Sequence, residues 1–168
     1  MSAINEVNMR EYYGKVYPVE DVVDWVSYRN CQSLSETQSY LSRREFCFTL
    51  IGDIFTRHRS YNGVDHLRKE LVNKFPEKID VGAIYNVAPD LKKATNIVAL
   101  ERELVFDIDM SDYDSVRSCC KGKKVCQFCW TWMSTAAHVL RKICTEDFGF
   151  KYFLPVFSGR RGIHLWVC

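Results

Sequence analysis

The sequence has no long hydrophobic run: no stretch of its 168 residues approaches the roughly 20 consecutive apolar residues that a membrane span needs. Its beginning, MSAINEVNMREYY, lacks the apolar core of a secretory signal peptide. It also lacks internal repeats, low-complexity tracts and flexible linkers, and its net charge of +2 is too small for a globally basic nucleic-acid binder. These absences predict a soluble intracellular protein, in which any contact with nucleic acid depends on local basic patches.

What is present is enough apolar material for a real core, because 47% of the residues are hydrophobic. This length favours one domain, or one domain with a small appendage. The apolar periodicity predicts helices over 19–28, 64–75 and 129–148, and strands over 44–50, 53–61, 78–87, from near Ile97 to Asp109, 151–157 and 163–168, with a surface loop at 89–96. Because helices interleave with strands, the predicted fold class is α/β or α+β.

The eight cysteines do not indicate a disulfide scaffold, because a secretion signal is missing and their spacing is lopsided. Four are scattered and are most simply buried free thiols: Cys31, Cys47, Cys144 and Cys168. The other four crowd into the segment CCKGKKVCQFC: Cys119, Cys120, Cys126 and Cys129. Four thiolates satisfy tetrahedral Zn²⁺ without an open position, which is typical of a structural site. The alternatives are a redox-active C-x-x-C pair and simple buried thiols.

The segment ELVFDIDMSDYD places two acids inside an apolar run. Side chains alternate along a strand, so Asp107 and Asp109 share one face, about 7 Å apart, and Ile108 points to the other. Burying both carboxylates without a counter-charge is unfavourable, and a hard divalent cation such as Mg²⁺ or Mn²⁺ would remove that cost. The alternative is a solvent-exposed strand face. Asp112 and Asp114, which follow, are expected to be solvated or capping residues.

The segment FSGRRGIH predicts a tight basic turn between two strands. Ser158, Arg160 and Arg161 provide a hydroxyl and two guanidinium groups, and His164 lies just inside the next strand. Such a turn suits an oligophosphate, although an exposed basic turn with a hydrogen-bonded sheet histidine is the alternative. Beside a carboxylate pair, it would complete the two halves of a nucleotidyl-transfer site.

Together these segments resemble the small catalytic subunit of archaeal and eukaryotic DNA primases. The likeness runs in order through REFCFTL, DIFTRHRSY, KIDVGAIY, ELVFDIDMSDYDSVRSCC, VCQFCW, EDFGF and FSGRRGIHLWVC. It extends from about Tyr12 to Cys168, and the adjacent cysteines are similar to the eukaryotic branch. The resemblance implies the primase α/β fold, with mixed β-sheets flanked by helices and an appended structural zinc motif at 119–129.

The resemblance also implies roles for individual residues. Asp107 and Asp109 match the aspartates that bind catalytic Mg²⁺ or Mn²⁺, and the crowded cysteines match the zinc ligands. The positions that hold the phosphates of the incoming nucleotide match Ser158, Arg160, Arg161 and His164.

Further matches lie earlier in the chain. Glu45 matches the acidic residue that the family uses in beginning a primer. Arg57, Lys78 and Asp80 match other positions around the nucleotide, with Asp80 expected near the ribose.

By this likeness, the expected function is synthesis of short RNA primers from ribonucleoside triphosphates on single-stranded DNA, by two-metal-ion chemistry in replication. The expected partners are the large primase subunit and DNA polymerase alpha, in the nucleus. The family uses a third metal-binding aspartate further downstream, so residues 1–168 are expected to form a catalytic domain truncated at its C-terminus. The alternatives are a non-catalytic, zinc-stabilised binding module and a repair or translesion primase-polymerase of the same fold.

Overall fold

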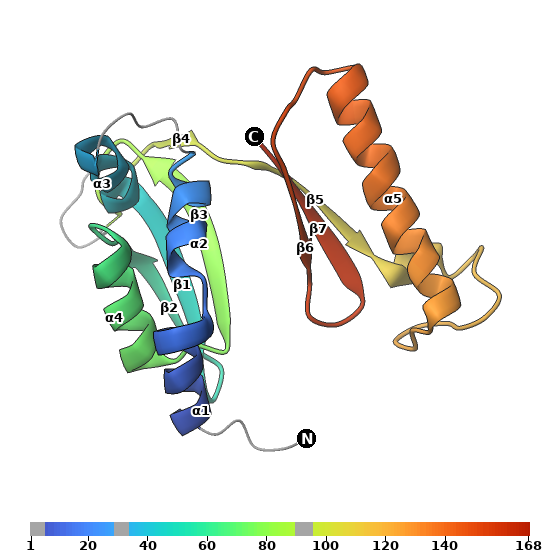
Figure 1. The fold of residues 1–168 in the computed structure, drawn as a ribbon, viewed down its shortest axis with the longest axis horizontal. Coiled ribbons are helices and arrows are strands. Elements are labelled where there is room, and N and C mark those ends of the chain that lie inside the picture. Colours follow the sequence, from blue (N-terminus) through green and yellow to red (C-terminus); the bar gives the residue numbers. More distant parts are fainter. Residues whose placement is uncertain (1–5, 29–33, 90–95) are drawn as a thin grey trace. The chain divides into compact units, whose positions relative to one another are not determined.

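The computed structural model describes residues 6–28, 34–89 and 96–168, and the chain divides into two compact units, Met1–Arg102 and Glu103–Cys168 (Figure 1). Each unit contains a β-sheet and helices, so the predicted class of α and β layers is confirmed. The strand pairs of the described residues are antiparallel in both sheets. Cys31 and most of the predicted loop at 89–96 lie outside the described residues.

The first unit is a four-stranded sheet, ordered β2-β1-β3-β4, with helices packed on one face (Figure 1). Its strands are β1 (Arg44–Leu50), β2 (Ile54–Arg59), β3 (Lys78–Tyr85) and β4 (Ala99–Glu101). Its helices are α1 (Glu6–Glu11), the π-helical turn η1 (Tyr12–Val16), α2 (Val19–Val26), α3 (Leu34–Arg43) and α4 (Val64–Lys74). The helices and the hairpin predicted for this part of the chain are therefore confirmed.

Alternation along β1 gives this sheet a buried face and a face without helices. Phe46 and Phe48 are almost fully buried and share a core with residues of α2 and α4. Glu45 and Cys47 alternate with them and so point to the opposite side of the sheet, which we call the helix-free face. Glu45 thereby lies away from the core that holds the unit together, whereas Arg44, at the start of β1, is fully buried.

One predicted strand boundary is wrong. Ala99–Glu101 forms β4, which pairs with β3 in the first sheet, whereas the strand that carries the two aspartates begins at Leu104 in the second sheet. Three charged residues, Glu101, Arg102 and Glu103, lie between the two apolar stretches, and β4 and β5 pair with different strands. The predicted strand wrongly ran through this charged segment.

The second unit is a three-stranded sheet, ordered β5-β7-β6, with one long helix on one face (Figure 1). Its elements are β5 (Leu104–Asp109), the 3₁₀ turn η2 (Met110–Tyr113), α5 (Gln127–Glu146), β6 (Phe153–Phe157) and β7 (Gly162–Val167). The predicted hairpin of β6 and β7 is confirmed, and so is the long helix, which begins at Gln127 rather than Cys129.

The helix α5 covers one face of the second sheet. Cys129 and Met133 pack with Ile108 near the start of the helix, and Cys144 packs with Leu165 near its end. These helix positions recur at the spacing of one helical face. The alternate residues of β5 and β7 therefore lie on the face of the sheet opposite α5.

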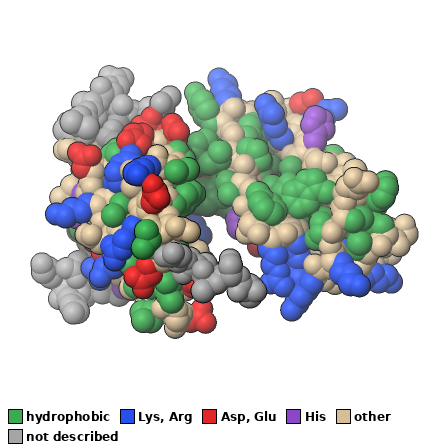
Figure 2. All heavy atoms as spheres, turned by 60° about the horizontal axis from the view of Figure 1, so that its bottom comes forward, with side chains coloured by type: hydrophobic (Ala, Val, Ile, Leu, Met, Phe, Trp, Pro, Cys, Tyr) green, Lys and Arg blue, Asp and Glu red, His purple; other side chains and the backbone are tan. Residues whose placement is uncertain are grey.

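The outer surface of the second unit carries apolar side chains as well. Phe128 and Phe148 are 68% and 70% exposed, and Val139 and Ile143 are exposed on α5. Figure 2 shows hydrophobic side chains across this unit, with Lys and Arg side chains along its upper and lower edges. Among the described residues, no helix combines the length and the apolar character needed to cross a membrane.

Candidate functional site

The two aspartates of β5 lie on the sheet face opposite α5. In the β5–β7 ladder, Asp107 is paired with His164 and Asp109 with Gly162. Ile108, between them, is 7% exposed and belongs to the core under α5. The predicted alternation is thus confirmed: both carboxylates share one face, and Ile108 faces the core.

Asp109 is held by several donors. The Nε of Arg161 lies 2.8 Å from Oδ1 and 2.9 Å from Oδ2 of Asp109. The backbone N–H and the hydroxyl of Ser111 also donate to Oδ1, at 2.8 and 2.7 Å, so Asp109 caps the turn η2. The bond from Arg161, followed by those from Ser111, holds the pKa of Asp109 well below its usual range. Asp109 is therefore a fixed, ionised carboxylate.

Asp107 has a looser environment. Its side chain is 77% exposed, and its Oδ1 lies 3.5 Å from the Nε2 of His164. This carboxylate can turn toward an ion or a ligand without breaking a tight hydrogen bond. The two aspartates therefore form a pair with one rigid and one adaptable member.

The basic turn between β6 and β7 is fastened to the end of β5. The N–H of Ser158 donates to the carbonyl of Gly162 at 3.0 Å, and the N–H of Gly162 donates to the Ser158 hydroxyl at 3.0 Å. The N–H of Met110 donates to the carbonyl of Arg161 at 3.3 Å. A Cβ on Gly162 would lie 2.6 Å from the carbonyl oxygen of Ile108, so only glycine fits there. Backbone contacts therefore set where the turn lies against β5.

The second unit thus brings together two carboxylates, a guanidinium group, a hydroxyl and an imidazole that the sequence predicts as site residues: Asp107, Asp109, Arg161, Ser158 and His164. Arg160 is exposed at the tip of the turn. The arrangement can bind a divalent cation next to an anionic ligand.

The remaining predicted residues belong to the first unit. Asp80 of β3 is paired with Cys47, and Lys78 with Thr49, so both lie on the helix-free face of that sheet. Arg57 of β2 lies over the ring of Phe55 at 4.8 Å. The helix-free face of the first sheet therefore carries all four residues: Glu45, Arg57, Lys78 and Asp80.

Glu45 has partners that the sequence did not reveal. Its Oε1 lies 2.9 Å from the Nδ1 of His58, and the hydroxyl of Tyr85 donates to its Oε2 at 3.1 Å. A Cβ on Gly82 would lie 2.6 Å from Oε2, so the carboxylate rests against a glycine. Burial, followed by the nearby Glu45 charge, raises the pKa of Tyr85. Glu45 is thus held from two sides.

His58 reaches Glu45 through an irregularity in β2. Phe46 is paired with Arg59 but Phe48 with Thr56, so two residues of β2 stand opposite Cys47 alone. At this bulge, His58 has a φ of 58°, which is uncommon for a residue other than glycine. Such bulges often redirect a side chain beside a functional site.

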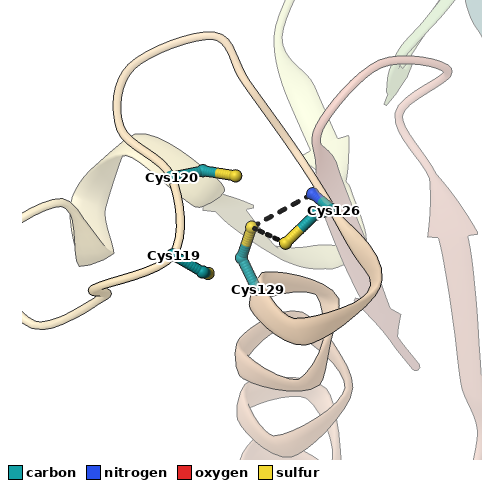
Figure 3. A group of neighbouring side chains, drawn as sticks. All are labelled: Cys119, Cys120, Cys126 and Cys129. Atoms are coloured by element: carbon teal, nitrogen blue, oxygen red, sulfur yellow. Dashed lines mark hydrogen bonds between the residues drawn. The ribbon is translucent and has the colours of Figure 1, made fainter.

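The four crowded cysteines converge (Figure 3). Their sulfur atoms all lie within 4.8 Å of one another, with 3.5 Å between those of Cys126 and Cys129. Cys119 and Cys120 come from the loop after η2, and Cys126 and Cys129 from the start of α5. Tetrahedral Zn²⁺ with bonds of about 2.3 Å separates its sulfur ligands by about 3.8 Å, so these residues fit a closed zinc site.

The thiols of this cluster differ in acidity. The N–H of Cys126 donates to the sulfur of Cys129 at 3.2 Å, and this bond is the main reason that the pKa of Cys129 falls to about 6. Hydrogen bonding with Cys126, together with burial, raises the pKa of Cys120 to about 12, and burial raises that of Cys119. One thiolate is therefore ready for a metal, whereas others ionise only as the metal binds.

Asp114, expected to be solvated or capping, is the C-terminal cap residue of η2, and Asp109 is its N-terminal cap. Asp114 also forms an ion pair with Arg117, which the sequence did not predict, and its Oδ2 accepts a bond from the N–H of Gly122 at 2.8 Å. Arg117 is 2% exposed and lies among the cysteines, and only the i,i+3 spacing of Asp114 and Arg117 could have indicated the pair.

Comparison with known proteins agrees with the geometry of the second unit. The family model of the DNA primase small subunit matches residues 106–168, from β5 to the end of β7.

Curated relatives match most of this chain. The DNA primase small subunit of Caenorhabditis elegans is 45% identical over 157 residues, which are 93% of this chain and 37% of that protein. That of Drosophila melanogaster is 42% identical over 159 residues, 94% of this chain and 35% of that protein. The archaeal subunit PriS of Pyrobaculum arsenaticum is 32% identical over 128 residues, 76% of this chain and 40% of that protein. The chain, which spans little more than a third of its animal relatives, belongs to the DNA primase small subunit family.

Proposed function

We propose that this chain carries the metal- and nucleotide-binding part of a primase catalytic centre, which makes RNA primers from ribonucleoside triphosphates on single-stranded DNA. The observation that carries the proposal is the β5–β7 ladder, which sets Asp107 opposite His164 and Asp109 beside the turn that holds Arg160 and Arg161. Carboxylates for a divalent cation and guanidinium groups for phosphate thus lie at one end of one sheet.

In the proposed mechanism, Asp107 and Asp109 would hold Mg²⁺ or Mn²⁺. When bound, these ions would activate the attacking 3′-hydroxyl and stabilise the leaving pyrophosphate. Arg160 and Arg161 would orient the triphosphate and neutralise its charge. The Ser158 hydroxyl accepts a bond from Gly162, so its own hydrogen is still available to a phosphate oxygen.

Arg161 supports a link between the two halves of the site. Its Nε bonds to Asp109, and a guanidinium has five N–H donors in all. The other donors of Arg161 would contact phosphate while Nε keeps Asp109 in place. The same side chain would thus set the carboxylate for the cation and bind the nucleotide.

Residues 1–168 would act as one catalytic domain. Glu45 would take part in beginning a primer, and Arg57, Lys78 and Asp80 would surround the nucleotide, with Asp80 near the ribose. Zn²⁺ on the crowded cysteines would be structural, because four thiolates leave no open position. The protein partners would be the large primase subunit and DNA polymerase alpha, and the nucleic-acid partners would be single-stranded DNA and the RNA primer. The location would be the nucleus, since animal and fungal relatives match along most of the chain.

The test is a calorimetric titration of the full chain with ATP, with and without Mn²⁺. We expect Mn²⁺-dependent binding that Asp107→Asn and Arg160→Ala each weaken about tenfold or more, as for the loss of a bond to a charged group. Asp112→Asn is the matched control, because Asp112 is an exposed acid in the same segment. Absence of Mn²⁺-dependent binding to the unaltered chain, or equal weakening by the control, would refute the proposal.

A further inference from the structure

Arg117 is the most enclosed charged group of the second unit's cysteine loop. Its side chain is fully buried. Its Nε donates to Oδ1 of Asp114 at 2.6 Å, and its terminal nitrogens donate to the carbonyls of Gly122 and Lys124, both at 2.8 Å. One terminal nitrogen also lies 3.7 Å from the sulfur of Cys129. The guanidinium therefore closes the loop and touches a zinc-ligand atom.

A continuous series of short contacts leads from this guanidinium to the end of β5. The N–H of Arg117 donates to the carbonyl of Tyr113 at 2.9 Å, and that of Asp114 donates to the carbonyl of Ser111 at 3.1 Å. Ser111 in turn donates two bonds to Asp109, the fixed carboxylate of the candidate catalytic pair. Cys129 and Asp109 are thus joined through η2, with no flexible segment in between.

The charges explain why a buried cation suits this position. Four thiolates around one Zn²⁺ carry a net charge of −2, and a nearby guanidinium offsets part of it. The buried guanidinium pairs with the carboxylate of Asp114 and lies beside the sulfur of Cys129, so its charge is compensated. Without it, Asp114 and the carbonyls of Gly122 and Lys124 would lose their donors, and the loop would relax.

We propose that Arg117 is a positioning residue that couples the cysteine cluster to Asp109, so that zinc binding and Mn²⁺–nucleotide binding strengthen each other. The proposal rests on the function proposed above for Asp107 and Asp109. Coupling between two binding sites is reciprocal, so Zn²⁺ would raise the affinity for Mn²⁺ and nucleotide by the same factor by which these raise the affinity for Zn²⁺. A residue that only braced the loop would affect zinc retention and leave the Mn²⁺ site unchanged.

The experiment compares the full, zinc-saturated chain with Arg117→Met and with a matched control, Lys123→Met. Lys123 lies in the same loop and carries the same charge, but it is exposed. The first measurement is the rate of zinc release to a chromophoric chelator. The second is the Mn²⁺ affinity in the presence of ATP, measured on protein that still carries its bound Zn²⁺. We expect Arg117→Met to release zinc about ten- to a hundredfold faster, the usual effect of losing an outer-shell partner. We expect its Mn²⁺ affinity to fall about three- to tenfold, with both values in the control within about twofold.

The possible outcomes separate the two proposals. If the unaltered chain binds Mn²⁺ and ATP and the Mn²⁺ affinity of Arg117→Met is unchanged, the coupling is refuted, but the proposed function is not. No Mn²⁺ binding to the unaltered chain would overturn both. If Arg117→Met lacks the native far-ultraviolet circular dichroism, Asp114→Asn replaces it, because this variant keeps the side-chain shape and removes the charge that Arg117 pairs with, together with one of the two acceptor oxygens. The same two changes are expected there, in smaller measure, and their absence would overturn the coupling.

Discussion

Gly162→Ala is the sharpest test of how the basic turn is placed. The added Cβ would lie 2.6 Å from the carbonyl oxygen of Ile108, whereas ordinary contact begins at 3.4 Å, so the backbone must separate by 3.4 − 2.6 = 0.8 Å. The obstacle is backbone within the β5–β7 ladder and cannot turn away as a side chain would. We expect a loss of about 2–3 kcal/mol in the free energy of unfolding, as for overpacked sites.

The functional effect follows from the same displacement. Moving β7 from β5 would lengthen the bonds from Arg161 to Asp109, so we expect Mn²⁺-dependent ATP binding to weaken together with stability. Gly159→Ala is the matched control, because a Cβ there meets nothing within 4 Å and only the φ of 83° is unfavourable. That strain should cost about 1–2 kcal/mol.

The assay is urea unfolding of the zinc-loaded chain, followed by tryptophan fluorescence. Three of the tryptophans, Trp130, Trp132 and Trp166, lie in the second unit and report on it. The reasoning would be refuted if Gly162→Ala unfolded within about 0.5 kcal/mol of the unaltered chain, the range of an ordinary surface substitution. It would also be refuted if Gly159→Ala weakened ATP binding as strongly.

Further predictions concern charge and metal. Because Arg161 lowers the pKa of Asp109, their pairing stabilises the fold above about pH 3.9 and is lost as the pH falls through the lower folded pKa. The stability difference between the unaltered chain and Arg161→Ala, measured by urea unfolding, should therefore shrink below about pH 4, and a difference that grew there would contradict this. Zinc binding to the metal-free chain should release more than two but fewer than four protons at pH 7.5, because Cys129 is largely ionised above pH 6. Below pH 6 the number of released protons should rise toward four. Calorimetry in buffers of different ionisation enthalpy measures this number, and a number independent of pH would contradict the prediction. Gly82→Ala should displace the Glu45 carboxylate and lower the free energy of unfolding by about 1–3 kcal/mol, because the added Cβ would lie 2.6 Å from Oε2 and 2.9 Å from the Cβ of Glu45, which moves only with the backbone. Carboxyl NMR shifts that matched those of the unaltered chain would exclude the displacement.

Local periodicity predicted the parts of the second unit that matter most for the site. The alternation in β5 was enough to assign Asp107 and Asp109 to one face and Ile108 to the core, and helical spacing was enough to find α5. The turn between β6 and β7 was recognisable from its glycines and arginines. These features depend on neighbours along the chain, which a single sequence displays directly.

The sequence did not predict features that depend on distant partners. The strand predicted from near Ile97 to Asp109 joined two segments, β4 and β5, that belong to different sheets. The contact of His58 with Glu45 needs a bulge, and no residue type marks it. Arg117 resembled any other surface arginine until the cysteine loop closed around it. The spacing of residues along the sequence does not predict contacts between residues that only the fold brings together.

The geometry also separates the roles of the two aspartates, which the sequence presents as equivalent. Asp109 ends β5, caps η2 and pairs with Arg161, so its carboxylate is fixed before any ligand arrives. Asp107 touches only the imidazole of His164 among the residues described around it, and most of its side chain is exposed. A cation that binds both would meet one rigid ligand and adjust the other. Under the proposed function, Asp109 would define where the cation binds relative to the arginine turn, and Asp107 would complete the coordination once the nucleotide is in place.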